Sequence, residues 1–94
     1  MRRHRIEPVR FRWIDWNRDK VLAHGLATPE VEFAWRRGLN LNRRRRDGSF
    51  ETLGRIPSGR LIRIIWHWNE VFDALEPGGA NKAVFVVTAY RADE

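Results

Sequence analysis

The chain of 94 residues contains no cysteine. It can therefore form no disulfide and offers no thiolate to a metal ion, which excludes disulfide-stabilised secreted scaffolds and cysteine-bound metal centres. No apolar run approaches the roughly 18 residues that a membrane-spanning helix requires. The basic N-terminus leads into no apolar segment of the kind that signal peptides contain. We therefore expect a cytoplasmic protein that makes no contact with a membrane.

Lysine is scarce although the chain is strongly basic. Of its 18 basic residues 16 are arginine, and the net charge is +6. Residues 1–63 carry 16 basic and 7 acidic side chains, whereas residues 64–94 carry 2 and 5. Such an excess of positive charge attracts polyanions. A guanidinium group can donate two hydrogen bonds to one phosphate, and it can also stack on a base. The composition favours RNA as a partner, although a GC-rich genome also explains abundant arginine.

Two further kinds of site are missing from the sequence. Gly78 and Gly79 are followed by neither the lysine nor the helix of a phosphate-binding loop. The histidines and carboxylates show no spacing typical of metal ligands. We expect neither a metal ion nor another cofactor.

The length predicts a single domain over residues 1–94, in which residues 1–8 form a flexible basic arm. Asp15 is expected to cap a helix over residues 16–24, which Gly25 ends in a left-handed conformation. A second helix is expected over residues 29–37 with Thr28 as its N-cap and Gly38 after its end. Both helices are short, so their stability depends on packing against other elements.

The remaining chain predicts strands. Residues 60–68 alternate most clearly, which separates Ile62, Ile64, Trp66 and Trp68 on one face from Leu61, Arg63, Ile65 and His67 on the other. Weaker strands are expected at residues 9–14, 39–42, 50–56 and 82–90, with a turn at 57–59 and a loop at 69–81 that holds one helical turn at 71–75. The expected fold is α+β, with two short N-terminal helices packed on an antiparallel sheet of three to five strands. The five tryptophans are expected mainly in its core, with Trp66 or Trp68 as alternatives for base stacking.

Several short segments lie in an order and at spacings that match a known family. They are Phe11-Arg12-Trp13, Asp19-Lys20, His24-Gly25-Leu26, Thr28-Pro29-Glu30, Thr52-Leu53-Gly54-Arg55, Ser58-Gly59-Arg60-Leu61 and the strand Val84–Val87 with Thr88-Ala89-Tyr90-Arg91. Together they cover residues 10–91 and resemble the BrnT toxins, which belong to the RelE/ParE superfamily of toxin–antitoxin ribonucleases. Three features depart from that family. Residues 43–46 are four arginines where the family usually has acidic side chains, the loop at 69–81 is longer, and Thr88-Ala89-Tyr90 replaces the more usual Ser-Ala-Arg.

The resemblance implies a RelE-like fold and a metal-independent endoribonuclease toxin that cleaves mRNA and blocks translation. Its partners would be mRNA, alone or on the ribosome, and a cognate antitoxin protein that covers the basic surface. Metal-free cleavage needs a base for the 2′-hydroxyl proton, an acid for the leaving 5′-oxygen and cations that stabilise the phosphate charge. The catalytic candidates are Arg63, His67, Tyr90, His24 and Lys20, and the RNA-binding candidates are Arg43, Arg44, Arg45, Arg46, Arg55, Arg60, Lys82 and Arg91.

Several of these residues also have ordinary structural explanations. His24 can stabilise the C-terminus of a helix, His67 can pack between tryptophans, and Arg63 can form a salt bridge. Arg63 and His67 lie four residues apart on one strand face, roughly 13 Å, so they cannot touch the same phosphorus. We expect them to line one concave surface with Tyr90.

Two other classes of function remain open from the sequence. One is a non-catalytic module that binds RNA or DNA through the same basic surface. The other is an interaction protein whose arginines meet an acidic partner.

Overall fold

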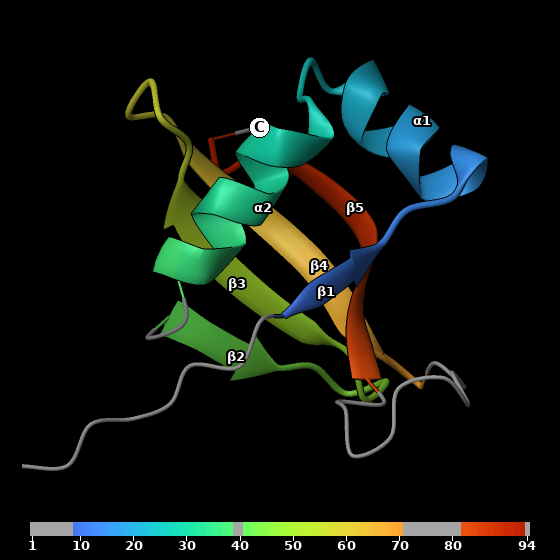
Figure 1. Ribbon diagram of the computed structural model, residues 1–94. Coiled ribbons are helices and arrows are strands. Elements are labelled where there is room, and N and C mark those ends of the chain that lie inside the picture. The colour runs from blue at the N-terminus through green and yellow to red at the C-terminus, as the bar shows by residue number, and fades with distance from the viewer. Residues whose placement is uncertain (1–8, 39–40, 71–81, 94) are drawn as a thin grey trace, which may run out of the picture.

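A computed structural model describes residues 9–38, 41–70 and 82–93 of the chain. These residues form two helices and a five-stranded sheet, so the expected α+β class is confirmed (Figure 1). In chain order the elements are β1 (Arg10–Arg12), α1 (Asp15–Ala23), α2 (Thr28–Arg37), β2 (Asn42–Arg44), β3 (Phe50–Arg55), β4 (Leu61–Glu70) and β5 (Lys82–Arg91). The arm expected at residues 1–8 and the helical turn expected at 71–75 lie outside the described residues.

The strands lie in the order β1-β5-β4-β3-β2. β2, β3, β4 and β5 pair antiparallel with their neighbours, but β1 pairs parallel with β5. The sheet is therefore mixed, and the expectation of a wholly antiparallel sheet was wrong at this edge. Alternation tells which face a residue lies on and carries no information about strand direction. Between β1 and β5 the chain contains both helices and three strands, far more than the crossover that a parallel pair requires.

Both helices begin one residue earlier than expected. Their N-caps are Ile14 and Ala27, so Asp15 and Thr28 are the first helical residues and do not cap. The side chain of the third helical residue satisfies the N-cap N–H instead, as in a capping box. The acceptors are Asn17 Oδ1 for Ile14 N (2.7 Å) and Glu30 Oε1 for Ala27 N (2.9 Å).

Glycines with positive φ lie after the end of α1 and in the turn before β4, as expected. Gly25 has a φ of +78°, as a left-handed residue after a helix should. Its N–H donates to Leu22 O at 2.8 Å, and Leu26 N donates to Val21 O at 3.0 Å. Gly59 also has positive φ and donates to Ile56 O at 2.8 Å, which confirms the turn at residues 57–59.

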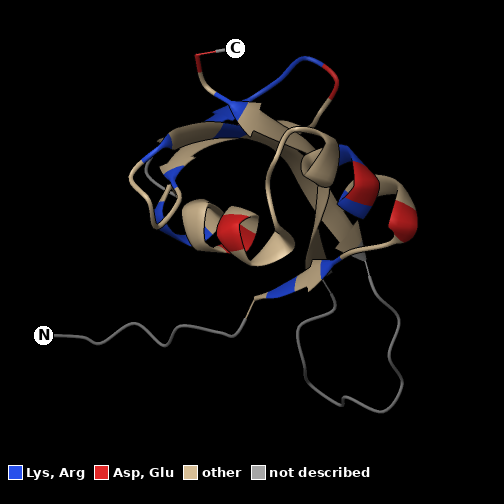
Figure 2. Ribbon diagram, turned by 90° about the horizontal axis from the view of Figure 1, so that it is seen from above, with Lys and Arg blue, Asp and Glu red and all other residues tan. Residues whose placement is uncertain are grey.

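The core lies between α2 and the concave face of the sheet, which arches over this helix (Figure 2). The expected phase of β4 is confirmed, because Ile62, Ile64 and Trp66 are buried there. Trp35 of α2 packs edge-on against Trp66 with ring centroids 5.2 Å apart. The buried cluster contains Val21, Leu26, Val31, Ala34, Trp35, Ile56, Ile62, Ile64, Trp66, Val84, Val86 and Ala89. Both helices and the two strands β4 and β5 thus contribute to one core.

Two glycines let α2 approach the sheet closely. A Cβ built on Gly54 of β3 would lie 2.0 Å from Ala34 O, and one on Gly38 would lie 2.2 Å from Leu53 O. Both distances are below any real carbon–oxygen contact. The segment around Gly54 is therefore fixed by helix–sheet packing.

Candidate nucleic-acid interface

The face of the sheet opposite α2 carries most of the expected catalytic residues. We call it the open face. On β4 it presents Leu61, Arg63, Ile65 and His67, as the alternation predicted. Cross-strand pairing with β5 places Tyr90 opposite Arg63 and Phe85 opposite His67. Because directly paired residues project from the same side of a sheet, these side chains share one surface. That surface is the convex side of the arch, since α2 occupies the concave side, so the expectation that Arg63, His67 and Tyr90 line a concave surface was wrong (Figure 2).

Helix α1 borders the open face along β5. Its buried residues Asn17 and Val21 hold it in place. The Asn17 side-chain amide donates to Arg12 O at 3.0 Å and to Val86 O at 2.9 Å, so it joins α1 to both β1 and β5. A different stripe, spaced every four residues, consists of Trp16 and Lys20 of α1 and of His24, the C-cap residue of this helix. This stripe contacts side chains of the open face at both of its ends.

One contact joins two of the catalytic candidates. The rings of His24 and Tyr90 have centroids 5.7 Å apart and are tilted by 50°. They come from α1 and from the end of β5, 66 positions apart in the chain. Lys20 lies one helical turn before His24, and Arg63 lies across the strand pair from Tyr90. Three of the five expected catalytic residues, His24, Tyr90 and Arg63, therefore lie at this end of the open face, whereas the Lys20 amine lies over the Trp16 ring.

Arg63 does not present a free charge to this group. Its Nη1 forms a hydrogen-bonded ion pair with Glu51 Oε2 of β3. The structure thus selects the salt bridge from the two explanations that the sequence left open. Because the Glu51 side chain is only 14% exposed, the pair is partly desolvated and resists exchange with solvent ions.

His67 belongs to a second, separate group. Its ring stacks on Phe85 at 5.1 Å and 19°, and its Nδ1 lies 3.0 Å from Trp68 O. On the other side Trp16 stacks with Phe85 at 6.2 Å and 23°. His67 remains roughly 13 Å along β4 from Arg63, so a phosphate held at the Tyr90 end is out of its reach. The predicted catalytic set is therefore divided between two places on one face.

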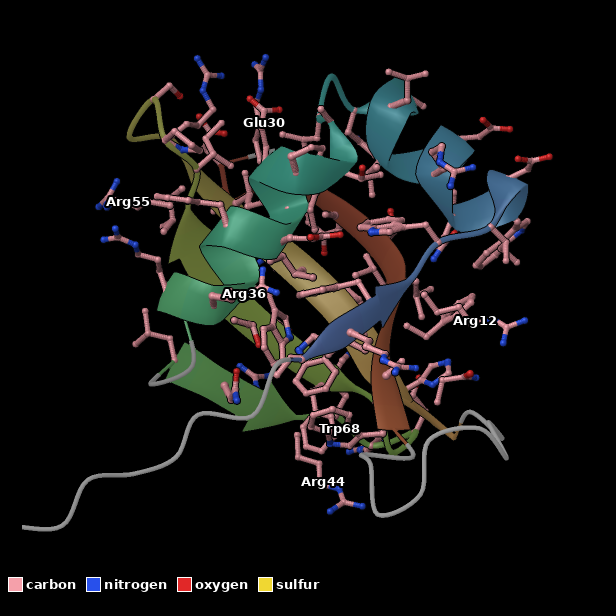
Figure 3. All side chains as sticks on the ribbon, in the orientation of Figure 1. Arg12, Glu30, Arg36, Arg44, Arg55 and Trp68 are labelled. Atoms are coloured by element: carbon pink, nitrogen blue, oxygen red, sulfur yellow. The ribbon has the colours of Figure 1, made fainter. Side chains whose placement is uncertain are left out.

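The expected RNA-binding arginines lie at the margins of the sheet. Arg43 and Arg44 are in β2, and residues 45–46 lead into the turn before β3; all four are exposed. Arg55 and Arg60 flank the turn between β3 and β4, and Arg91 ends β5. The side chain of Lys82 lies outside the described part of the structure. In Figure 3 the side chains of Arg44 and Arg55 extend from different margins of the sheet, so the expected RNA-binding arginines form no single patch.

Several of these arginines already have partners. Arg55 Nη1 donates to Gly59 O at 2.8 Å, and Arg44 lies over the Phe50 ring, 5.6 Å from its centroid. Arg45 contacts Ser49 Oγ at 3.3 Å within the turn between β2 and β3. Arg60 lines a cavity of about 320 Å³ together with Leu61, Ala92 and Asp93. All four of these arginines are nevertheless exposed, so N–H donors of their guanidinium groups can still reach an anion.

The turn between β2 and β3 contains a carboxylate with a shifted pKa. The Ser49 hydroxyl donates to Asp47 Oδ1 at 2.6 Å, and Ser49 N donates to the same oxygen at 2.9 Å. These hydrogen bonds, with a smaller attraction from Arg45, lower the pKa of Asp47 below its usual value. Asp47 therefore organises the turn that presents the arginine run.

Sequence reasoning missed two members of the surface. Trp16 is 50% exposed and Phe85 is half-buried, and neither was a candidate. The signal for Trp16 was present, because Trp16, Lys20 and His24 share the four-residue spacing of one helix face. Phe85 could be linked to them only through the register of β5.

Within residues 9–38, 41–70 and 82–93, no group of three or more His, Asp or Glu side chains is placed to hold a metal ion. None of the described helices is long and apolar enough to cross a membrane. Comparison with known proteins gives no match for this chain, whether with protein-family models, curated proteins or solved structures.

Proposed function

We propose that the protein is a metal-independent endoribonuclease toxin of a type II toxin–antitoxin pair, which cleaves mRNA and blocks translation. The observation that carries this proposal is the contact between His24 and Tyr90 at the border of the open face. Imidazole and phenol are both proton-transfer groups, and both side chains here are only partly buried, so they can still reach a substrate. The BrnT-like order of segments and a RelE-like fold are part of the proposal, and the observed α+β architecture is compatible with them.

The chemistry follows from the two groups. His24 takes the proton from a ribose 2′-hydroxyl, whose oxygen then attacks the adjacent phosphorus. The bond to the 5′-oxygen breaks, and this leaving oxygen receives a proton from the Tyr90 hydroxyl. The products are a 2′,3′-cyclic phosphate and a 5′-hydroxyl. Lys20 lies one turn before His24 with its Nζ over the Trp16 ring, so it supplies positive charge to a neighbouring phosphate of the strand and not to the one that is cleaved.

The arginines around the sheet supply the affinity for the RNA backbone in this proposal. Their distribution over several margins suits a flexible polyanion that crosses the face. The cognate antitoxin would be a protein with acidic side chains that covers the same surface.

A second candidate is a module that binds RNA without cleaving it. The ion pair between Arg63 and Glu51 favours this alternative, since it occupies a cation that was expected to stabilise the transition state. Under this alternative the His24–Tyr90 contact would only position α1 against β5.

The test combines growth after induced expression with cleavage of a synthetic RNA in EDTA. Wild type is compared with His24→Gln, Tyr90→Phe and His67→Gln, and Leu22→Ala serves as a control on the exposed opposite side of α1. We expect toxicity and cleavage from wild type and Leu22→Ala, and a loss of about 10²–10⁴-fold in rate for His24→Gln. A folded, RNA-bound wild type that neither cleaves nor inhibits growth would establish the binding module instead. Loss of cleavage in His67→Gln alone would move the catalytic centre to the second group.

A further inference from the structure

Three rings from three elements form a stack across the open face. Phe85 of β5 lies between His67 of β4 and Trp16 of α1. The centroid separations are 5.1 Å to His67 and 6.2 Å to Trp16, with interplanar angles of 19° and 23°. The rings are thus nearly parallel, in the arrangement that a further flat ring can extend.

This stack is separate from the aromatic core. Trp35 and Trp66 are each 2% exposed beneath α2, whereas Trp16 is 50% exposed. The attachment of α1 to the sheet depends on Asn17, which joins two strands, and on Val21, which is fully buried. Neither function requires a tryptophan at the solvent-facing end of the stack. Its large exposed ring is therefore available to a ligand.

Cations flank the exposed end of the stack. Lys20 Nζ lies over the Trp16 ring, 4.6 Å from its centroid. Arg12, an exposed residue of β1, pairs in register with Phe85. Aromatic rings with cations beside them are the usual means of binding single-stranded nucleic acid, because the rings receive bases and the cations receive phosphates.

We propose that the Trp16–Phe85–His67 stack binds an unpaired nucleobase of a single-stranded RNA. The base extends the stack on the outer side of Trp16, and Lys20 moves from the ring to the adjacent phosphate. A base within a duplex cannot bind in this way, since its faces are covered by its neighbours. Stacking tolerates any base, so the subsite selects for single strands and not for sequence.

This inference rests on the proposed function for its ligand and adds a position to it. Trp16 and His24 are eight residues apart on α1, about 12 Å along the helix axis. The stacked base therefore belongs to a nucleotide near the scissile bond but not at it. The subsite would hold the strand while the bond lies at His24 and Tyr90.

The structure also offers a matched control. Trp68 is 41% exposed, close to the value for Trp16, but it belongs to the opposite face of the sheet beside Trp66. Figure 3 shows it at the margin where Arg44 emerges, away from α1. Replacing either tryptophan removes a partly exposed indole; Trp68 also packs against Trp35 and Trp66, and only Trp16 lies in the proposed subsite.

The experiment measures fluorescence anisotropy of a labelled 12-nucleotide RNA whose 2′-hydroxyls are methylated, so that binding is read without cleavage. The same strand in a duplex is the second probe. We expect Trp16→Ala to weaken binding of the single strand by about 5- to 150-fold and to leave duplex binding and the salt dependence of affinity unchanged. Trp16→Phe should retain most of the affinity, and Trp68→Ala should bind as wild type does. Circular dichroism establishes that each variant is folded.

Equal losses for Trp16→Ala and Trp68→Ala, equal losses on single strand and duplex, or no loss at all would each overturn the stacking subsite. These results are independent of cleavage. A wild type that shows the expected binding pattern but leaves unmethylated RNA intact would remove the nuclease and retain the subsite. A wild type that cleaves RNA while Trp16→Ala binds normally would retain the nuclease and remove the subsite.

Discussion

The two faces of the sheet differ in what their aromatic side chains touch. Beneath α2 the rings of Trp35 and Trp66 meet edge to face and are almost completely buried. On the open face the rings of Trp16, Phe85 and His67 lie nearly parallel, and cations stand beside them. The covered face also contains a stacked pair, Phe50 and Trp66, at 4.8 Å and 26°, so the feature that distinguishes the open-face stack is its exposed end at Trp16. The comparison shows that one face forms the core, and it motivates the proposal that the other face binds a ligand.

The largest effect is expected from the covered face. Trp66→Ala should lower the free energy of unfolding by about 3–5 kcal/mol, because it empties the centre of the core and leaves the hydroxyl of Thr52 without its indole donor. Urea unfolding followed by circular dichroism measures this loss. For Trp16→Ala we expect a loss of less than about 1 kcal/mol in the free energy of unfolding. An equally small loss for Trp66→Ala would contradict the division between the two faces.

A smaller loss is expected where α2 approaches β3. Gly54→Ala places a methyl group against the backbone carbonyl of Ala34, so the helix must move away from the sheet. We expect about 1–3 kcal/mol of destabilisation, the usual cost of overpacking. Gly48→Ala is the control for losing a glycine, since nothing lies within 4 Å of its Cβ position, although its positive φ adds some strain. Equal unfolding midpoints for Gly54→Ala and Gly48→Ala would argue against close packing of α2 on the sheet.

The arginine run should affect binding and leave stability nearly unchanged. Replacing Arg43–Arg46 with serine should weaken RNA binding at least tenfold at low salt, for single strand and duplex alike. The slope of log affinity against log salt should fall by about 0.7 for each lost phosphate contact to a single strand. Anisotropy titrations at several salt concentrations measure both quantities. An unchanged slope would show that these side chains are an ordinary solvated surface.

Glu51→Gln gives a test in the opposite direction. It removes the partner of Arg63 and returns one positive charge to the open face. We expect RNA to bind a few-fold more tightly, with a loss of about 1 kcal/mol or less in stability because the ion pair is only partly buried. Glu32→Gln is a matched control, since Glu32 also faces an arginine but lies on α2. A similar gain in both variants would indicate a general charge effect.

The smallest effect concerns the turn between β2 and β3. Folding lowers the pKa of Asp47 from 3.8, so its contribution to stability is complete above that value. It is lost as pH falls through the lower value of the folded state. Asp47→Asn should therefore flatten the decline in stability between about pH 5 and about pH 3. Unfolding curves of both proteins across this interval measure the difference, and identical profiles would contradict the assignment.

The sequence predicted the fold class and the two helices to within one residue at each end. The alternation of β4 also assigned Arg63 and His67 to one face correctly, because period two is a direct consequence of strand geometry. The direction of β1 could not be predicted, since a three-residue edge strand has the same pattern in either orientation. The helices and the alternation of β4 follow from local geometry, whereas the direction of β1 depends on the path of the whole chain.

The composition of the candidate site could be predicted only in part. An irregularity between Ile65 and Trp66 shifts the pairing of β4 with β5, so that Ile65 lies opposite Thr88 but Trp66 lies opposite Val86. This shift decides that Tyr90 faces Arg63 and that Phe85 faces His67. A bulge leaves no clear mark in residue alternation. The division of the expected catalytic set into two groups therefore required coordinates.

The parallel pairing of β1 with β5 has a consequence for how the protein is made. β1, the first described strand, pairs only with β5, the last one. The Asn17 amide likewise donates to the carbonyl of Val86 in β5, so both interactions form only after β5 has been synthesised. At a synthesis rate of about 5–20 residues per second, the intervening segment takes several seconds to emerge. Until then neither the edge of the sheet nor the meeting of His24 with Tyr90 can exist. The ribosome would thus synthesise all the strands of the sheet before the proposed catalytic centre first assembles. Synthesis of the chain is therefore separated in time from its proposed activity.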